Sequence, residues 1–289
     1  MEFVELAGGV RMPVVGFGTW KAAGAQIDDE MAKNALAAGY RHIDSAEYYG
    51  TEEAIGRALR ASGLAREDVT VTSKVWKTHM GYDGTVQAID RSLERFGFDY
   101  LDLYFMHWPK YDTEAADWEE VMLETWRAME DARRAGKVRA LAVSNFKPHH
   151  LESLRQHASG VPAVNQVEFH PGWLQEETCA YCAEHGIAVQ AWRPLAQGGV
   201  FEHPAIAGAA AAHGVTPGQV ALRFDLQCGV CVIPKSSSPA RMAQNIDVFG
   251  FALTDAEMDA IRAIPKGTAW SGIDPDGEWP EDIVELKID

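Results

Sequence analysis

The sequence is short of basic residues, and this shortage argues against one class of partner. Its 289 residues include 26 lysines and arginines against 42 aspartates and glutamates, which gives a formal net charge of −16. A nucleic acid needs a basic surface to face its phosphates, so we expect no nucleic-acid partner. A phosphate-bearing cofactor needs only a local basic patch and stays compatible with this charge.

Targeting and membrane segments are also lacking. The first ten residues, MEFVELAGGV, have neither the basic start nor the apolar core of a signal peptide. No apolar run approaches the ~18 residues that cross a bilayer. We therefore expect a cytoplasmic protein with no membrane partner.

Cysteine is scarce, although its spacing is suggestive. The four cysteines form two C-x-x-C pairs, Cys179/Cys182 and Cys228/Cys231. Paired motifs of this kind bind zinc at a separation of about 15–20 residues, whereas 45 residues intervene here. The segment EETCAYCAEHG predicts a helix, and Cys231 lies in the apolar run VCVIP. We expect reduced thiols and no metal, with structural zinc or a redox pair as the alternatives.

Short apolar runs that favour β-structure alternate with helical patterns along the chain. Hydrophobic residues make up 47% of the sequence, enough for a large core. Eight runs separated by helices predict a parallel sheet that closes into a (β/α)8 TIM barrel, in a single domain over residues 1–289. The eight runs are Val14–Gly18, Tyr40–Asp44, Val69–Lys74, Leu101–His107, Val138–Asn145, Val164–Glu168, Ala188–Trp192 and Val230–Lys235.

Additions to the barrel are predicted at three places. FVELAGGVRMP predicts an N-terminal β-hairpin that turns at Ala7-Gly8-Gly9. The long segment before the last strand contains two helix patterns, Pro204–His213 and Pro217–Gln227, so we expect extra helices there. The end of the chain, from about residue 266 to 289, is rich in Pro, Gly and Asp and predicts a loop over the active-site face.

Residues that can carry chemistry follow three successive strands. Asp44 and Tyr49 lie in DSAEYYG, Lys74 in VTSKVW and His107 in LDLYFMHWP. The carboxyl ends of barrel strands converge on one face, so these side chains should meet. A lysine inside a barrel is desolvated and needs a carboxylate, which Asp44 can supply. We expect Tyr49 to reach the ammonium, which would lower the phenol pKa toward neutrality, while Asp44 partly offsets the cation and leaves the phenol mainly protonated. His107 could then orient a substrate oxygen.

These groups can polarise a carbonyl, but none of them supplies electrons. A cofactor must therefore provide the hydride. No GxGxxG motif follows a strand, and GFGTW at 16–20 is only a weak glycine cluster. Any nucleotide should bind on the face of the barrel.

Taken in order, several motifs resemble the aldo-keto reductases, NADPH-dependent carbonyl reductases built on a (β/α)8 barrel. They are GFGTW, DSAEYYG with EEAIG, SKVW, LDLYFMHWP, VSNF, VNQVEFHP, AWRPLAQG and VIPKSS, and they cover nearly the whole chain. HWP and the AWxPL pattern are most similar to the prokaryotic 2,5-diketo-D-gluconate reductase-like branch. The resemblance implies reduction of aldehyde or ketone carbonyls to alcohols, NADPH (NADP+) as cofactor, a small-molecule carbonyl substrate and a monomer.

The resemblance also implies roles for individual residues. It places the catalytic tetrad on Asp44, Tyr49, Lys74 and His107, with Tyr49 rather than Tyr48 as the acid. The implied cofactor contacts are Gly18, Thr19, Trp20, Ser144, Asn145, Gln166, Trp192, Arg193, Pro194, Leu195, Lys235, Ser236, Arg241, Gln244 and Asn245. Within this set, Ser144, Asn145 and Gln166 correspond to carboxamide contacts, Trp192 to the ring stacked on the nicotinamide, Lys235, Ser236 and Arg241 to 2′-phosphate contacts, and Gln244 and Asn245 to adenine contacts. The implied substrate contacts are Trp20, Trp76, His107, Trp108 and Trp270.

Three positions depart from the family pattern. Ser45 replaces the usual Thr, a mild change. Thr51 stands where Asn is common, and we expect it to cap the following helix. Arg193 occupies a position usually held by Ser near the pyrophosphate. It could strengthen phosphate binding or point to solvent.

Two other functions remain open at this point. Lys74 could form a Schiff base with a substrate carbonyl, as in a barrel aldolase, although an Asp44 partner that keeps it charged argues against this. Alternatively, the chain could be a non-catalytic NADP(H)-binding protein, which the complete tetrad disfavours. Taken singly, the Lys–Asp pair, His107 and the tryptophans could each be structural.

Overall fold

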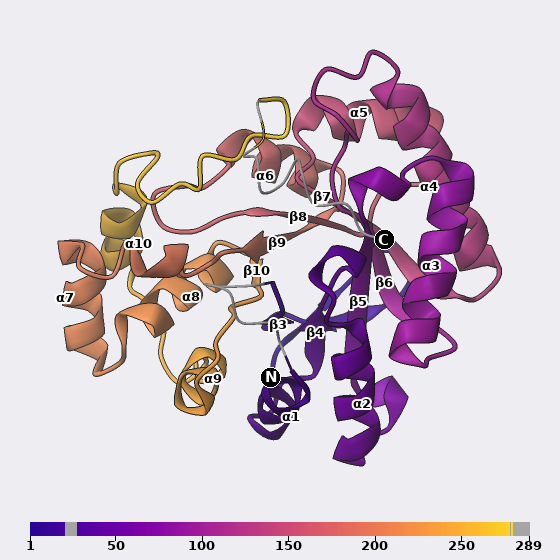
Figure 1. The fold of residues 1–289 in the computed structure, drawn as a ribbon. Coiled ribbons are helices and arrows are strands. Elements are labelled where there is room, and N and C mark those ends of the chain that lie inside the picture. The colour runs from indigo at the N-terminus through magenta and orange to yellow at the C-terminus, as the bar shows by residue number, and fades with distance from the viewer. Residues whose placement is uncertain (21–27, 278, 280–289) are drawn as a thin grey trace.

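A computed structural model describes residues 1–20, 28–277 and 279, and its centre is a sheet of eight parallel strands (Figure 1). The strands are β3 (Phe17–Gly18), β4 (His42–Asp44), β5 (Thr70–Val75), β6 (Leu101–Met106), β7 (Val138–Ser144), β8 (Val164–Glu168), β9 (Ala188–Trp192) and β10 (Cys231–Val232). Their order in space follows their order in the chain. Val15 forms a parallel bridge with Val232, which joins the first segment to the last. The predicted (β/α)8 barrel is confirmed.

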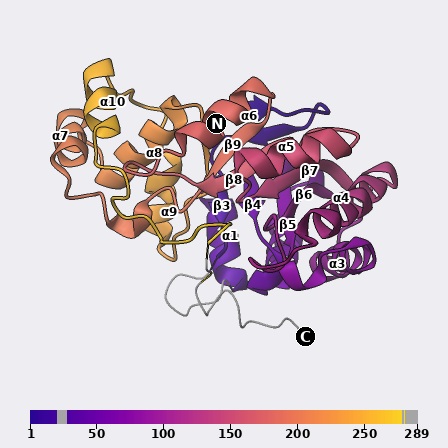
Figure 2. The same ribbon diagram turned by 90° about the horizontal axis from the view of Figure 1, so that it is seen from above.

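Helices surround this sheet and connect its strands (Figures 1 and 2). They are α1 (Asp29–Ala37), α2 (Glu52–Ser62), α3 (Tyr82–Phe96), α4 (Trp118–Arg134), α5 (Pro148–His157), α6 (Glu176–Glu184), α7 (Pro204–His213), α8 (Pro217–Gln227), α9 (Pro239–Ile246) and α10 (Asp255–Arg262). Thr216 and Thr254 begin α8 and α10 with capping boxes, in which the side chain and the third helical residue satisfy each other's backbone N–H groups. Of the helices that the structure describes, none could span a membrane.

The predicted additions are present as well. Strands β1 (Phe3–Glu5) and β2 (Arg11–Pro13) form the antiparallel hairpin around the predicted turn. Helices α7 and α8 have the bounds that their sequence patterns predict. Figure 2 shows α7, α8 and α10 gathered on one side of the barrel. Short 3-10 turns lie in the connecting segments, at η1 (Glu47–Tyr49), η2 (Arg66–Asp68), η3 (Lys77–His79) and η4 (Ala196–Gly198).

The inside of the barrel has an apolar floor. Side chains alternate along a strand, so Leu103 and Phe105 of β6 point inward while Tyr104 and Met106 join the core under the helices. Met12 from the hairpin packs with Leu103 and Phe105 and is fully buried. The hairpin therefore closes the amino-terminal end of the barrel.

Above this floor lies a layer of polar side chains. Lys74 is the register partner of Phe105, so it also points into the barrel. Asp44 and Thr72 are register partners, as are Gln166 and Gln190, and all these side chains are buried. A change from apolar to polar side chains along the barrel axis thus places the ionisable groups at the carboxyl ends of the strands.

Two helical glycines give a paired prediction of stability. A Cβ at Gly56 of α2 would overlap the carbonyl oxygen of Phe96 at the end of α3, whereas a Cβ at Gly208 of α7 would meet nothing. Glycine costs a helix up to about 1 kcal/mol relative to alanine. Gly208→Ala should therefore raise the free energy of unfolding by about 0.5–1 kcal/mol. Gly56→Ala should lower it by about 1–3 kcal/mol because the backbones must separate. Urea unfolding measures both, and a stabilised Gly56→Ala variant would refute the close helix contact.

Candidate active site

The buried pair Lys74 and Asp44 lies at the centre of the polar layer. The Lys74 ammonium donates to Asp44 Oδ2 at 2.7 Å and to the Ser45 carbonyl oxygen at 2.8 Å, and its side chain is inaccessible to solvent. Asp44 Oδ1 accepts from Thr72 Oγ1 and from Gln166 Nε2, both at 2.9 Å. Both oxygens of this carboxylate therefore accept hydrogen bonds, from the adjacent strand β5 and from Gln166 of β8, which is not adjacent in the sheet.

Tyr49 and His107 lie directly beside this pair. The Tyr49 hydroxyl is 3.4 Å from His107 Nε2, and the Lys74 ammonium lies 5.0 Å from the centre of the Tyr49 ring. Tyr49 ends the short turn η1, and His107 follows β6. The four residues that the sequence predicts as a tetrad thus come together on one face, although they span more than sixty positions of the chain.

Burial dominates the protonation of these groups. It raises the pKa of Tyr49 well above its ordinary value, and the negative charge of Asp44 acts in the same direction. Burial lowers the pKa of His107 well below its ordinary value, and the Lys74 charge adds to this effect. It also lowers the pKa of Lys74, against the opposing attraction of Asp44. At neutral pH, Tyr49 is a protonated phenol and His107 a neutral imidazole.

The predicted fall in the Tyr49 pKa is therefore wrong. The ammonium meets the face of the phenol ring rather than its hydroxyl, and its charge is already shared with Asp44. Desolvation of the phenolate then prevails over the remaining attraction. The phenol still holds the proton that an acid catalyst must donate.

A second expectation, that Thr51 caps α2, is also wrong. Its side chain makes no capping hydrogen bond. The Thr51 hydroxyl instead lies 2.7 Å from Ser45 Oγ and 3.1 Å from Thr19 Oγ1. Thr19 Oγ1 in turn donates to the Asp44 carbonyl oxygen. This chain of hydroxyls holds the loop that carries Asp44 and Ser45.

Aromatic rings form one wall of the site. Tyr48 stacks between Trp20, at 5.0 Å between ring centres, and Trp76, at 3.9 Å. Trp76 also presents its ring to His107 at 5.0 Å. Tyr48 was not among the predicted contacts, although its place next to the acid in EYYG is a signal that could have found it.

Two tryptophans of the C-terminal segment lie in different surroundings. Trp279 packs on Trp108 at 5.1 Å between ring centres and joins the buried cluster with Trp76. Trp270 stacks on Trp173 at 4.7 Å and is 37% exposed, and its contact with a substrate stays a prediction. The segment has no periodicity that could have indicated which tryptophan turns inward.

The predicted carboxamide contacts lie next to the tetrad. Asn145 Nδ2 donates to the His107 carbonyl oxygen at 3.0 Å, and Trp192 Nε1 donates to Asn145 Oδ1 at 2.8 Å. Ser144 Oγ donates to the Gln166 carbonyl oxygen. Asn145 adopts a left-handed backbone conformation (φ 65°), which turns its amide back toward β6. Ser144, Asn145, Gln166 and Trp192 thus border the place where His107 and Tyr49 meet.

A basic patch after β10 fits a phosphate. Arg241 Nε lies 3.4 Å from Ser236 Oγ, and the neighbouring Arg241 charge adds to burial in lowering the pKa of Lys235. Neither cation is within ion-pair distance of a carboxylate in the described part of the chain. Two like charges held together without a counter-ion are suited to a dianion. Gln244 and Asn245 follow on α9.

Close backbone packing brings this patch to the barrel. A Cβ at Gly18 would lie 2.6 Å from the Ile233 carbonyl oxygen, so glycine permits β3 to approach the segment after β10. Leu195 packs on the core under the helices, and Pro194 precedes it. Gly18 thus ends β3, and Pro194 and Leu195 lie in the loop after β9, so the barrel holds all three predicted cofactor contacts in place.

Arg193 does not point to solvent. Its guanidinium donates to Glu168 Oε1 at 2.9 Å and to the Ala269 carbonyl oxygen at 2.7 Å. Ser271 donates its backbone N–H and its hydroxyl to the same Glu168 carboxylate. Arg193 and Glu168 thus bind the C-terminal segment to the carboxyl ends of β8 and β9.

A second set of ion pairs binds the same segment. Asp276 lies 2.7 Å from Lys110, 3.1 Å from Lys147 and 3.0 Å from His150 Nε2. His149, His150 and Asp276 could offer ligand atoms to a metal. The two ammonium groups already neutralise Asp276 and would repel a metal ion, so we interpret this set as a salt-bridge cluster.

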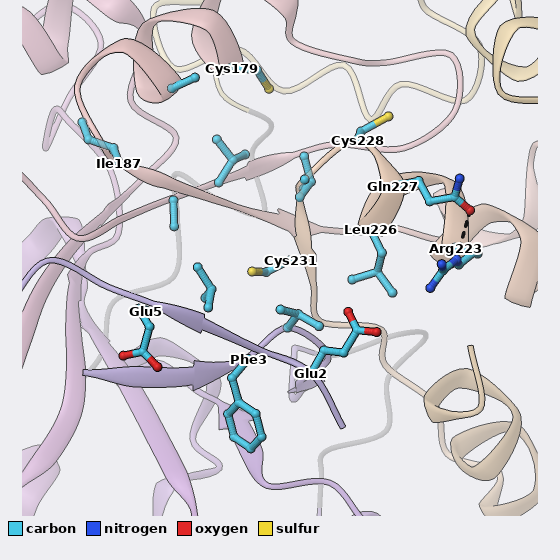
Figure 3. A pocket seen from close by; sticks show the side chains of 17 residues that line it. Glu2, Phe3, Glu5, Cys179, Ile187, Arg223, Leu226, Gln227, Cys228 and Cys231 are labelled. Carbon is cyan, nitrogen blue, oxygen red and sulfur yellow. Dashed lines mark hydrogen bonds between the residues drawn. The ribbon is translucent and has the colours of Figure 1, made fainter. Parts of the chain in front are cut away.

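The cysteines lie at the other end of the barrel. All four are free thiols. Cys179, Cys228 and Cys231 line a cavity of about 660 Å³ between the hairpin and helices α6 and α8, which Figure 3 shows with Phe3 and Glu5 on the opposite wall. Burial raises the pKa of Cys228 to about 11, which leaves the thiol protonated and unreactive at neutral pH.

Comparisons with known proteins agree with this geometry. The profile of the aldo/keto reductase family matches residues 14–266. The chain belongs to the aldo/keto reductase family. It is 44% identical over 265 residues to the glyoxal reductase of Bacillus subtilis (strain 168), covering 92% of this chain and 93% of that protein. An aldo/keto reductase is an oxidoreductase that acts on carbonyl groups, and the predicted family and reaction class are confirmed.

Solved structures of the family share the fold. An aldo/keto reductase from Brucella melitensis matches with a TM-score of 0.84 and 39% identity, covering 91% of this chain and 99% of that one. The Bombyx mori aldo-keto reductase, solved in complex with NADP, matches with a TM-score of 0.86 and 34% identity, covering 94% and 95%.

The pKa directions predict a flat pH profile for this aldo/keto reductase. Tyr49 keeps its proton as the pH rises, and His107 stays neutral as the pH falls. The kcat/KM for carbonyl reduction should therefore vary little from about pH 6.5 to about pH 9. Initial rates across that range measure it. An alkaline limb centred near neutrality would contradict this profile and would show that Tyr49 or the Lys74 ammonium loses its proton there.

Proposed function

We propose that this enzyme reduces aldehyde and ketone carbonyls to alcohols, with NADPH as the electron donor and Tyr49 as the acid. The observation that carries the proposal is the buried Lys74–Asp44 pair beside a Tyr49 hydroxyl in contact with His107. A bound NADPH supplies the hydride for the carbonyl carbon. This chain's residues bind the carbonyl oxygen, orient it and protonate it.

Each member of the tetrad takes one role in this proposal. Tyr49 donates its phenolic proton to the carbonyl oxygen as negative charge develops there. The Lys74 ammonium, 5.0 Å from the ring centre, stabilises the phenolate that remains. Asp44 holds the ammonium in place. Neutral His107 donates a hydrogen bond from Nε2 to the same oxygen.

The residues of the cofactor site support NADPH. Ser144, Asn145, Gln166 and Trp192 border the tetrad and would receive the nicotinamide. Lys235, Ser236 and Arg241 would hold the 2′-phosphate, with Gln244 and Asn245 beside the adenine. The Lys235 and Arg241 cations, which have no carboxylate partner among the described residues, support this orientation, because a 2′-phosphate would supply a counter-charge.

Several finer assignments belong to the same proposal. We assign the chain to the 2,5-diketo-D-gluconate reductase-like branch on its HWP and AWxPL motifs. It would act as a cytoplasmic monomer and as one barrel domain. The segment from about 266, of which 278 and 280–289 lie outside the described residues, would cover the active-site face. Contacts of Ser271 with Glu168 and of Trp279 with Trp108 support this cover.

A Schiff-base aldolase is a weaker candidate. A nucleophilic lysine needs a neutral amine with access to the substrate. The Lys74 amine donates to two oxygens and is wholly buried beneath the Tyr49 ring. A non-catalytic NADP(H)-binding role would not require the four tetrad side chains to lie together.

Replacement of Tyr49 tests the acid. Tyr49→Phe should lower kcat by about 100- to 10,000-fold, the range for loss of a general acid, while NADPH binding changes little. The control is Tyr48→Phe, which makes the same change one residue away. NADPH consumption and fluorescence titration of NADPH measure the two effects. A larger loss of kcat in Tyr48→Phe would reassign the acid.

Replacement of Arg241 tests the phosphate site. Arg241→Ala should weaken NADPH by about 10- to 100-fold, as expected for losing a hydrogen bond between charged groups, and NADH much less. The matched control is Arg133→Ala, on the exposed side of α4. Dissociation constants for both cofactors measure the difference. Equal weakening of NADPH and NADH would remove the 2′-phosphate role from Arg241.

A further inference from the structure

Lys77 is a buried cation at the edge of the aromatic wall. It follows Trp76 at the end of β5 and begins the turn η3. Only 7% of the residue is exposed, in a protein whose acidic residues outnumber its basic ones by 42 to 26. An ammonium in such a place normally has a carboxylate partner, because burying an unpaired charge is costly.

No such partner exists in the described part of the chain. Glu47, at the start of the turn η1, accepts from the Trp76 backbone N–H and lies 3.1 Å from His79 Nδ1, so its carboxylate already has partners. Asp112 attracts Lys77 from beyond ion-pair distance, and burial still lowers the pKa of the Lys77 ammonium. The Lys77 ammonium is therefore partly desolvated, and no carboxylate of the described residues pairs with it.

The surroundings of Lys77 add further unused donors. Its ammonium lies 4.4 Å from the ring centre of Trp279 and 5.9 Å from that of Trp76. The indole N–H groups of Trp76 and Trp279 are buried, and neither has a hydrogen-bond partner among the residues that the structure describes. Cation–π contacts offset part of the desolvation, but they leave N–H donors without acceptors. This cluster of donors is suited to an anionic group.

The anion site is connected to the catalytic one. Trp76 presents its ring to His107 at 5.0 Å, and the Lys77 ammonium lies beside the same indole. A molecule whose carbonyl oxygen contacts His107 and Tyr49 could therefore extend along Trp76 to Lys77. The Lys77 ammonium and the His107 ring lie 5.9 Å and 5.0 Å from the Trp76 ring centre, so the indole lies next to both groups. The anion must then be separated from the carbonyl by several atoms.

We propose that Lys77 is a specificity-determining residue, which binds the carboxylate of an aldehyde or ketone substrate whose carbonyl lies several atoms away. The inference rests on the proposed reductase function and adds a substrate class to it. A carboxylate fits better than a phosphate ester, because one ammonium faces it here whereas the 2′-phosphate patch provides two cations. Neutral aldehydes would bind the same pocket without this contact.

The test compares pairs of aldehydes in which one member carries a carboxylate and the other does not. para-Carboxybenzaldehyde is paired with benzaldehyde, and succinic semialdehyde with butanal. The wild-type enzyme should prefer the carboxylated member of at least one pair in kcat/KM. Lys77→Met should reduce this preference by about 10- to 100-fold, mainly through KM, because a contact made equally in the ground and transition states is lost.

Two further variants control the comparison. Lys77→Arg keeps the charge and should retain most of the preference. Lys33→Met makes the same chemical change at an exposed position of α1 and should leave the preference as in the wild type. Benzoate provides a readout that does not depend on turnover of an acidic substrate. It should inhibit benzaldehyde reduction by the wild type more strongly than by Lys77→Met.

The outcomes separate the two proposals. If benzaldehyde and butanal are reduced but neither carboxylated partner is preferred, Lys77 does not bind a substrate carboxylate, and the reductase function stands. The same conclusion follows if Lys77→Met keeps the wild-type preference. If no aldehyde of either kind consumes NADPH, the reductase function fails and the Lys77 inference fails with it.

Discussion

One ion pair in the barrel interior determines the arrangement of the site. Lys74 and Asp44 are both buried, and desolvation would make either of them unstable alone. Together with Thr72, Gln166 and the Ser45 carbonyl, they satisfy one another's hydrogen bonds between β4, its neighbour β5 and the more distant strand β8. The pair supplies a positive charge beneath the Tyr49 ring in a place that water does not reach. There the charge acts on a developing phenolate with little screening.

The same exclusion of water explains why the phenol stays protonated. Desolvation favours neutral Tyr49 and neutral His107 more strongly than the ammonium favours the phenolate. This protonation state suits carbonyl reduction. Tyr49 begins with the proton that it must donate, and neutral His107 adds no second positive charge beside Lys74. The aromatic wall of Tyr48, Trp76 and Trp108 contributes to this exclusion. The C-terminal segment adds Trp279 and is held by Glu168, Arg193 and Lys110.

Residues in regular elements could be predicted closely, whereas residues in loops could not. Strand β8 and helices α7 and α8 have the predicted bounds, since their apolar periods and capping signals are local. Threonine is a residue type that often caps helices, which is why the sequence predicts a cap at Thr51. Its hydroxyl instead forms hydrogen bonds with the hydroxyls of Ser45 and Thr19, which come close only in the folded chain. Arg193 and Trp270 lie in loops without periodicity, so nothing local indicated Glu168 or Trp173 as their neighbours.

The sequence by itself determined that eight strands close a barrel and that Asp44, Tyr49, Lys74 and His107 lie at adjacent strand ends. This follows from hydrophobic patterning, because parallel strands present their carboxyl ends on one face. Only the tertiary structure decided the direction of the Tyr49 pKa, the inward turn of Trp279 and the burial of Lys77 without a carboxylate partner among the described residues. These three depend on how much water the assembled site excludes and on which charges lie within reach. The exclusion of water and the set of nearby charges each depend on many residues that are far apart in the chain.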